Sequence, residues 1–139
     1  MARVAADYNR AVTRTAPASI LRGVRVLVVD DDDDARELLA SIFEVFSAEV
    51  VSAGGAREAL RVARSQAPHV VVTDLMMPGE DGYWLLRQLR QETPTLPVIT
   101  VSGVANNASE VLAEGFDGYL RKPYDPDTLV DLVVQMSRP

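Results

Sequence analysis

Short apolar runs rich in β-branched residues recur along the chain from residue 24 onward, and segments with a different spacing separate them. The runs are largely continuous, which is typical of strands buried on both faces of a sheet. The predicted strands cover residues 24–29, 49–53, 70–73, 98–101 and 116–121.

The segments between these runs carry apolar residues three and four positions apart, which is the spacing of one helix face. In the first segment, that face is formed by Leu38, Leu39, Ile42, Phe43 and Phe46. The remaining predicted helices centre on residues 56–63, 85–89, 108–114 and 129–136.

Several helix ends carry recognisable capping residues. Asp34 begins an Asp-x-x-Glu sequence that resembles a capping box, and Asn107 lies where the first turn of the fourth helix begins. Gly115 follows that helix at a capping position, and Asp125-Pro126 suits the start of the last one.

Five strands alternating with five helices predict an α/β fold, a doubly wound parallel sheet with helices on both faces. The expected strand order is 2-1-3-4-5, the flavodoxin-like order. Residues 1–22 show no sustained period, so we expect a flexible leader or linker there and one domain over residues 23–139.

Charge is unevenly distributed over the 139 residues. The net charge is -6, whereas residues 1–22 have four arginines and one aspartate, so the remainder has -9. An acidic body argues against nucleic-acid binding. With no cysteine, no apolar run of membrane length and no secretory signal, we expect a cytoplasmic protein without a membrane partner.

Polar residues follow four of the five predicted strands. Asp30 and Asp31 follow the first, Asp74 the third, Ser102 the fourth and Lys122 the fifth. Because the carboxyl ends of parallel strands meet at one edge, where ligands bind in such sheets, we expect these side chains to lie together.

Three carboxylates placed together repel one another unless a cation compensates them. All-oxygen ligands suit Mg²⁺, which is therefore the expected cofactor. A carboxylate beside Mg²⁺ can attack phosphorus, and the transferring group then needs positive or donating groups around it. Lys122, the only lysine in the chain, supplies a compact charge, and Ser102 supplies a hydroxyl.

At these residues the chain resembles the receiver domains of two-component response regulators. The resemblance begins near residue 24 and extends to the end of the chain. The segments that carry it are residues 26–31, 72–82, 97–103 and 115–123.

The resemblance implies a role for each acid. Asp74 would be the phosphoacceptor. Asp31 would bind Mg²⁺ directly, and Asp30 would act on it largely through water. The backbone carbonyl of Met76 would be a further protein ligand of the metal.

The same resemblance implies a switch. Ser102 would bind a phosphoryl oxygen, and Lys122 would pair with the phosphoryl group. Tyr119 occupies the aromatic switch position of the family. The bond between Lys122 and Pro123 is expected to be cis.

Two further features concern rate and output. Met76 and Val104 occupy positions that tune hydrolysis in the family, and both are apolar here, which predicts slow self-dephosphorylation. The stretch from Ser102 to Lys122 is shorter than the family pattern, so we expect a shortened fourth helix. The usual dimer surface includes that helix, and we therefore expect a monomer or a weak homodimer.

The implied function is that of a bacterial phosphorelay signalling module rather than an enzyme. A histidine kinase or phosphotransfer protein would be the donor, and a downstream protein would read the result. The chain would be a single-domain regulator or the receiver of a hybrid kinase.

Two alternatives are also compatible with the sequence. A haloacid-dehalogenase-type phosphohydrolase also uses Asp, Mg²⁺, Ser and Lys, and Asp30-x-Asp32 follows a strand as that class requires. A receiver that binds its partner without phosphorylation is the second alternative.

Overall fold

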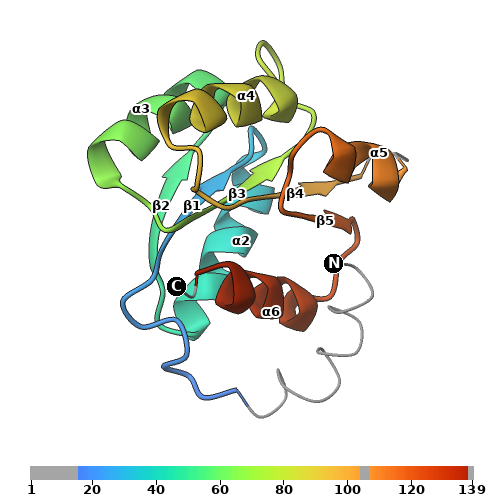
Figure 1. Cartoon of the computed structure of the whole chain (residues 1–139). Coiled ribbons are helices and arrows are strands. Elements are labelled where there is room, and N and C mark those ends of the chain that lie inside the picture. Colours follow the sequence, from blue (N-terminus) through green and yellow to red (C-terminus); the bar gives the residue numbers. More distant parts are fainter. Residues whose placement is uncertain (1–15, 104–106, 138–139) are drawn as a thin grey trace.

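A five-stranded parallel sheet forms the centre of the protein in the computed structural model, which describes residues 16–103 and 107–137 (Figure 1). The strand order is β2-β1-β3-β4-β5, as predicted. The strands are β1 Arg25–Val29, β2 Glu49–Ala53, β3 Val70–Asp74, β4 Val98–Ser102 and β5 Gly118–Arg121.

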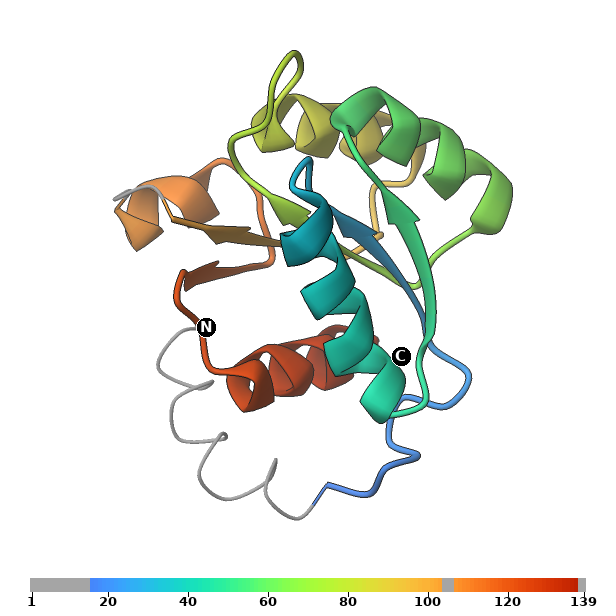
Figure 2. The ribbon, with the colours of Figure 1, turned by 180° about the vertical axis from the view of Figure 1, so that it is seen from behind.

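Helices cover both faces of this sheet. Figures 1 and 2 show α3 and α4 together on one face and α2 and α6 on the other. The helices are α2 Asp33–Val45, α3 Ala56–Gln66, α4 Gly82–Glu92, α5 Ala108–Ala113 and α6 Pro126–Ser137. No helix in these parts of the chain combines the length and apolar character that crossing a bilayer requires.

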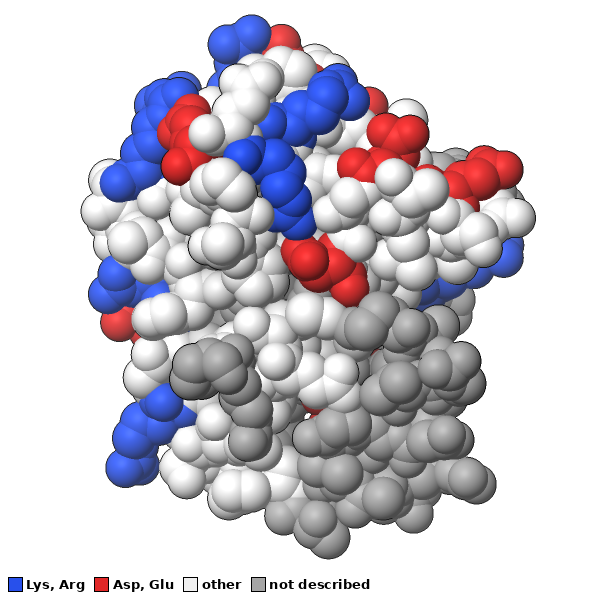
Figure 3. Space-filling model, in the orientation of Figure 1, with Lys and Arg blue, Asp and Glu red and all other residues white. Residues whose placement is uncertain are grey.

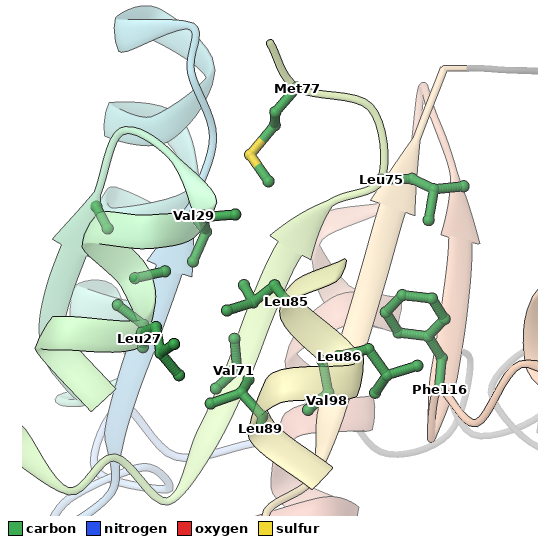
Figure 4. Close-up of a cluster of buried hydrophobic side chains, with 14 of the residues drawn as sticks. Leu27, Val29, Val71, Leu75, Met77, Leu85, Leu86, Leu89, Val98 and Phe116 are labelled. Atoms are coloured by element: carbon green, nitrogen blue, oxygen red, sulfur yellow. The ribbon is translucent and has the colours of Figure 1, made fainter. Parts of the chain in front are cut away.

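Alternation along the central strands creates two cores. In β1, Leu27 packs toward α3 and α4, whereas Val26 and Val28 pack toward α2 and α6. Figure 4 shows the first of these cores, where Leu85 and Leu89 of α4 meet the sheet. Burial of both strand faces explains why the apolar runs are continuous.

The fourth predicted helix is short, as expected. Its counterpart α5 has only six residues. The Asn107 side chain caps it by accepting a hydrogen bond from the Ser109 N–H at 2.8 Å. Gly115, with φ of 114°, ends it in a conformation that favours glycine.

The first described helix begins earlier than the capping-box pattern indicated. Asp32, not Asp34, is the N-cap of α2, and its carboxylate accepts from the Asp34 N–H at 3.2 Å. In a run of five aspartates, each residue is chemically able to cap. Which aspartate becomes the N-cap depends on where β1 ends, and the local sequence pattern does not determine where that is.

The expected boundary at residue 23 needs a correction. Leu21 is fully buried in the core beneath α2 and α6, and its N–H donates to the Phe46 carbonyl at 3.0 Å. The Ser47 hydroxyl donates to the Ala18 carbonyl. The described end of the expected leader, residues 16–22, therefore packs on the domain, while residues 1–15 lie outside the described part.

Candidate functional site

The polar residues predicted to meet do converge on one sheet edge. Asp30 follows β1 directly, Asp74 and Ser102 are the last residues of β3 and β4, and Lys122 follows β5. Parallel pairing aligns these strand ends, with Asp74 opposite Val101 in the register. The site is therefore a direct consequence of strand order.

Lys122 lies between two of the acids. Its Nζ is 3.4 Å from Asp30 Oδ2 and 3.8 Å from Asp74 Oδ2. The Asp30 side chain is only 2% exposed and that of Asp74 14%, whereas 31% of the lysine remains exposed. A buried carboxylate needs a partner, and this ammonium is available to both.

A third carboxylate completes the cluster. Asp30, Asp31 and Asp74 each offer a carboxylate oxygen, and these atoms all lie within 4.8 Å of one another. Of these three acids, Asp31 is the one that is exposed to solvent. Oxygen donors this close to one another suit a hard divalent cation such as Mg²⁺, so these residues fit the predicted cofactor.

The Asp74 carboxyl is electrostatically perturbed. Burial raises its pKa above the ordinary value, the Lys122 ammonium opposes this, and the charges of Asp30 and Asp31 raise the pKa further. The site therefore disfavours a negative charge on Asp74 in the absence of a bound cation. A divalent cation at the three acids would reverse that balance.

Backbone contacts hold the acids in place. Asp30 Oδ1 accepts from the Asp32 N–H at 3.0 Å, and Asp74 Oδ1 accepts from the Leu75 N–H at 2.8 Å. Each carboxylate thus has one oxygen fixed by the chain and one directed at Lys122. Since Asp32 caps α2, its carboxylate is already engaged, which weakens the hydrolase alternative that needs it for chemistry.

Two residues that support the site were missed by sequence reasoning. Arg36 of α2 donates from Nη1 to the Asp30 carbonyl at 2.8 Å and pairs with Asp33. Gly82, the first residue of α4, donates its N–H to the Leu75 carbonyl at 2.8 Å. Both residues contact the loop that precedes their own helix, and such contacts leave no periodic signal in the sequence.

Ser102 is fully buried at the end of β4. Its carbonyl accepts from the Lys122 N–H at 2.9 Å, so the backbone joins the residues that carry the hydroxyl and the ammonium. The following bond, from Lys122 to Pro123, is cis. Of the two predicted rate-tuning residues, Met76 is 50% exposed and Val104 lies outside the described residues.

Tyr119 faces the core rather than solvent. It is 8% exposed and belongs to the cluster beneath α3 and α4. Its hydroxyl is buried, and no hydrogen-bond partner for it occurs within residues 16–103 and 107–137. A buried hydroxyl without a partner bears an energetic cost.

An apolar groove of about 360 Å³ opens beside the acids. It is lined by Asp30, Asp32, Ala35, Leu38, Leu39, Ile42, Lys122, Pro123, Tyr124 and Pro126. Leu38 was expected on the buried face of α2, but it is 57% exposed and borders this groove. Burial raises the pKa of the Tyr124 phenol, and the Asp30 charge adds to this effect.

Comparison with known proteins agrees with this geometry. A sequence model described as "Response regulator receiver domain" matches residues 26–134. An uncharacterised 14.6 kDa protein of Leptolyngbya boryana is 40% identical over 114 residues, covering 79% of this chain and 87% of that protein. The response regulator protein FleR of Pseudomonas aeruginosa is 37% identical over 113 residues, covering 80% of this chain.

A solved structure gives the same result in three dimensions. The response regulator receiver domain protein of Clostridium thermocellum is 30% identical with a TM-score of 0.77, and the alignment covers 82% of this chain and 94% of that one. The present chain spans only 24% of FleR, so the activities of that whole protein do not transfer.

The fold and its acidic edge define a CheY-like α/β signalling domain. The chain belongs to the response regulator receiver domain family of two-component systems. Members of this family are signalling modules that interact with histidine kinases or phosphotransfer proteins and bind Mg²⁺ at an acidic pocket.

Proposed function

We propose that this domain is a phosphoacceptor switch that receives a phosphoryl group on Asp74. The observation that carries the proposal is the position of Lys122 Nζ, within 4 Å of both Asp74 and Asp30 at the carboxyl edge of the sheet. One Asp74 oxygen accepts from the Leu75 N–H, which leaves the other, next to Lys122, for chemistry.

The transfer is a displacement at phosphorus. The Asp74 carboxylate oxygen forms a P–O bond, the P–N bond to the donor histidine breaks, and its electron pair stays on the imidazole nitrogen. Lys122 would then pair with the new phosphoryl oxygens, and the Ser102 hydroxyl would donate a hydrogen bond to one of them. Charge that builds on those oxygens is stabilised by donors already in position.

Asp30, Asp31 and Asp74 would hold Mg²⁺, with the Met76 carbonyl as a further ligand. The cation would neutralise charge on the acids and on the transferring oxygens. The raised pKa of Asp74 supports this requirement, because burial, together with the charges of Asp30 and Asp31, disfavours the ionised nucleophile.

The groove beside the acids is our candidate for the surface that docks the phosphodonor. Leu38, Ile42 and Tyr124 line it. Asp30 and Lys122 also line it, and both belong to the polar cluster around Asp74. Exposed apolar surface next to a reactive site is typical of an interaction surface. A helix presenting a phosphohistidine would bury Leu38 while placing phosphorus near Asp74.

Incubation with acetyl phosphate and Mg²⁺, read by intact mass, tests the proposal. We expect wild type to gain one phosphoryl group and Asp74→Asn to gain none. Asp34→Asn is the matched control, since Asp34 belongs to the same acidic run but lies outside the cluster, and it should be modified like wild type. A wild type that gains no phosphoryl group contradicts the proposal and favours a phosphorylation-independent receiver.

A further inference from the structure

A second groove lies between α3 and α4, away from the acidic pocket. It has a volume of about 350 Å³ and is lined by Arg57, Leu60, Arg61, Arg64, Trp84 and Gln88. The three arginines are at positions i, i+4 and i+7 of α3, so they share one face of that helix. Figure 3 shows several blue side chains in the upper part of the view, where α3 and α4 lie, with red side chains next to some of them.

This basic face stands out because the protein is acidic. The net charge of the whole chain is -6. Helices α3 and α4 together contain five arginines against two glutamates, whereas α2 contains four acids against one arginine. The positive charge on this part of the surface is therefore segregated rather than dispersed.

Ion pairs within the domain use only part of that charge. Arg57 pairs with Glu80 at 2.9 Å, Arg64 pairs with Glu92 at 2.6 Å, and Arg90 of α4 pairs with Asp117 at 2.7 Å. Arg61 lies between Arg57 and Arg64 on the same helix face, is exposed, and makes no ion pair in the described ranges. One cation at the centre of the groove is thus available to a ligand.

The groove also has an apolar floor. Trp84 packs partly against the core, and the Arg57 guanidinium carbon lies 5.1 Å from the centroid of its ring system. Leu60 lies beside it. A ligand that combines carboxylates with an apolar side chain would match both the cationic rim and this floor.

We propose that this groove binds an acidic segment of a partner protein. The net negative charge of the domain repels a long polyanion such as nucleic acid, whereas a short acidic segment needs only the local positive potential. The groove between α3 and α4 shares no residue with the cluster of Asp30, Asp31 and Asp74 or with the groove beside it. Binding there therefore goes beyond phosphoryl transfer and is testable without it.

Trp84 makes a direct test possible because it is the only tryptophan in the chain. The probe is a short synthetic peptide in which glutamates flank a single leucine, titrated into the full chain while Trp84 fluorescence is recorded. We expect a saturable change that weakens as salt rises. The same peptide with glutamine for glutamate should produce no saturable change.

Charge-reversal variants locate the binding. Arg61→Glu should weaken peptide binding about tenfold or more, a difference of about 1.4 kcal/mol. The control Arg22→Glu makes the same charge change at an exposed residue outside the groove and should bind like wild type. Because Arg61 is exposed, a thermal melt should show that both variants are folded. If Arg61→Glu does not fold, Arg61→Gln is used in its place.

Four outcomes would overturn the proposal. They are the absence of saturable binding, equal losses in Arg61→Glu and Arg22→Glu, equal binding of a single-stranded oligonucleotide of the same charge, and equal binding of the glutamine peptide. Sedimentation without peptide adds a fifth, because self-association abolished by Arg61→Glu would make a second copy the occupant.

Discussion

A Cβ atom on Gly82 would lie 2.7 Å from the carbonyl oxygen of Asp74, closer than real Cβ atoms approach other atoms. It would also lie 3.0 Å from the Leu75 Cα. Both neighbours are backbone and cannot rotate away. The start of α4 therefore packs directly on the segment that carries the proposed phosphoacceptor, and only glycine permits that approach.

Replacing Gly82 with alanine should shift the backbone at Asp74. We expect Gly82→Ala to lower the free energy of unfolding by about 1–3 kcal/mol, the usual cost of overpacking. It should also weaken Mg²⁺ binding, because an acid of the cluster moves. Gly55→Ala is the matched control, since a Cβ there meets nothing within 4 Å. Equal melting temperatures and Mg²⁺ affinities for the two variants would contradict the close contact.

Magnesium should stabilise the folded domain through Asp31. When free Mg²⁺ is about a hundred times Kd, the expected gain is about 2.7 kcal/mol. Thermal melts with and without Mg²⁺ should show the gain in wild type and most of its loss in Asp31→Asn. Asp34→Asn keeps all three clustered acids and should retain it. A gain of equal size in both variants would place the cation elsewhere.

The raised pKa of Asp74 makes stability depend on pH. Because the folded-state pKa lies above the ordinary value of 3.8, the unfolded chain releases this proton first as pH rises. Well below the ordinary pKa, Asp74 is protonated in both states and does not affect the free energy of unfolding. As pH rises from there, its ionisation increasingly destabilises the folded state, and the effect becomes constant above the folded-state pKa. Without Mg²⁺, Asp74→Asn should therefore melt higher than wild type at pH 7 and equally at pH values below 3.8.

Magnesium serves as the internal control for this comparison. Burial is the main cause of the raised pKa, and a cation at the acids would offset it by stabilising the ionised carboxylate, so saturating Mg²⁺ should shrink or reverse the advantage of Asp74→Asn. If wild type is the more stable protein at neutral pH without any divalent cation, the assigned direction of the pKa shift is wrong.

Sequence reasoning succeeded where one-dimensional order determines three-dimensional position. Parallel strands align their carboxyl ends, so residues that follow separate strands, such as Asp74 and Lys122, must share an edge. Strand type also followed directly from the pattern, because β-branched runs buried on two faces have few alternatives. The shortened α5 followed from the length of the segment between Ser102 and Lys122.

What sequence reasoning missed depends on packing between elements. Leu38 and Leu39 are adjacent and chemically identical, yet one is 57% exposed and the other 1%. Which of the two is buried depends on which face of α2 is turned toward the sheet. A lone Leu21 and the guanidinium of Arg36 contribute no periodicity, so their contacts with the core and with Asp30 became visible only in the structure.

The buried hydroxyl of Tyr119 gives a prediction about stability. A buried hydroxyl without a partner costs about 1–3 kcal/mol. Among residues 16–103 and 107–137 the Tyr119 hydroxyl has none, so Tyr119→Phe should raise the free energy of unfolding by about 1 kcal/mol. Denaturant titration at constant m-value measures the change. Tyr83→Phe is the control, because Tyr83 packs against the same core cluster but is only partly buried, and that variant should not be stabilised. Destabilisation of Tyr119→Phe would show that the hydroxyl has a partner in the folded protein.

We expect Met76 to influence the lifetime of the phosphoryl group on Asp74. Its side chain is half exposed, two residues after the proposed phosphoacceptor, and has no group that can orient an attacking water. We therefore expect the Asp74 phosphoryl group to persist well beyond seconds after loading. Met76→Asn introduces an amide at that point and should speed hydrolysis several-fold by positioning water, while Leu38→Asn places the same amide on α2 and should leave the rate unchanged. Loss of the phosphoryl mass with time after removal of acetyl phosphate measures all three rates. Decay of the wild type within seconds, or equal rates for wild type and Met76→Asn, would show that this position does not limit the water.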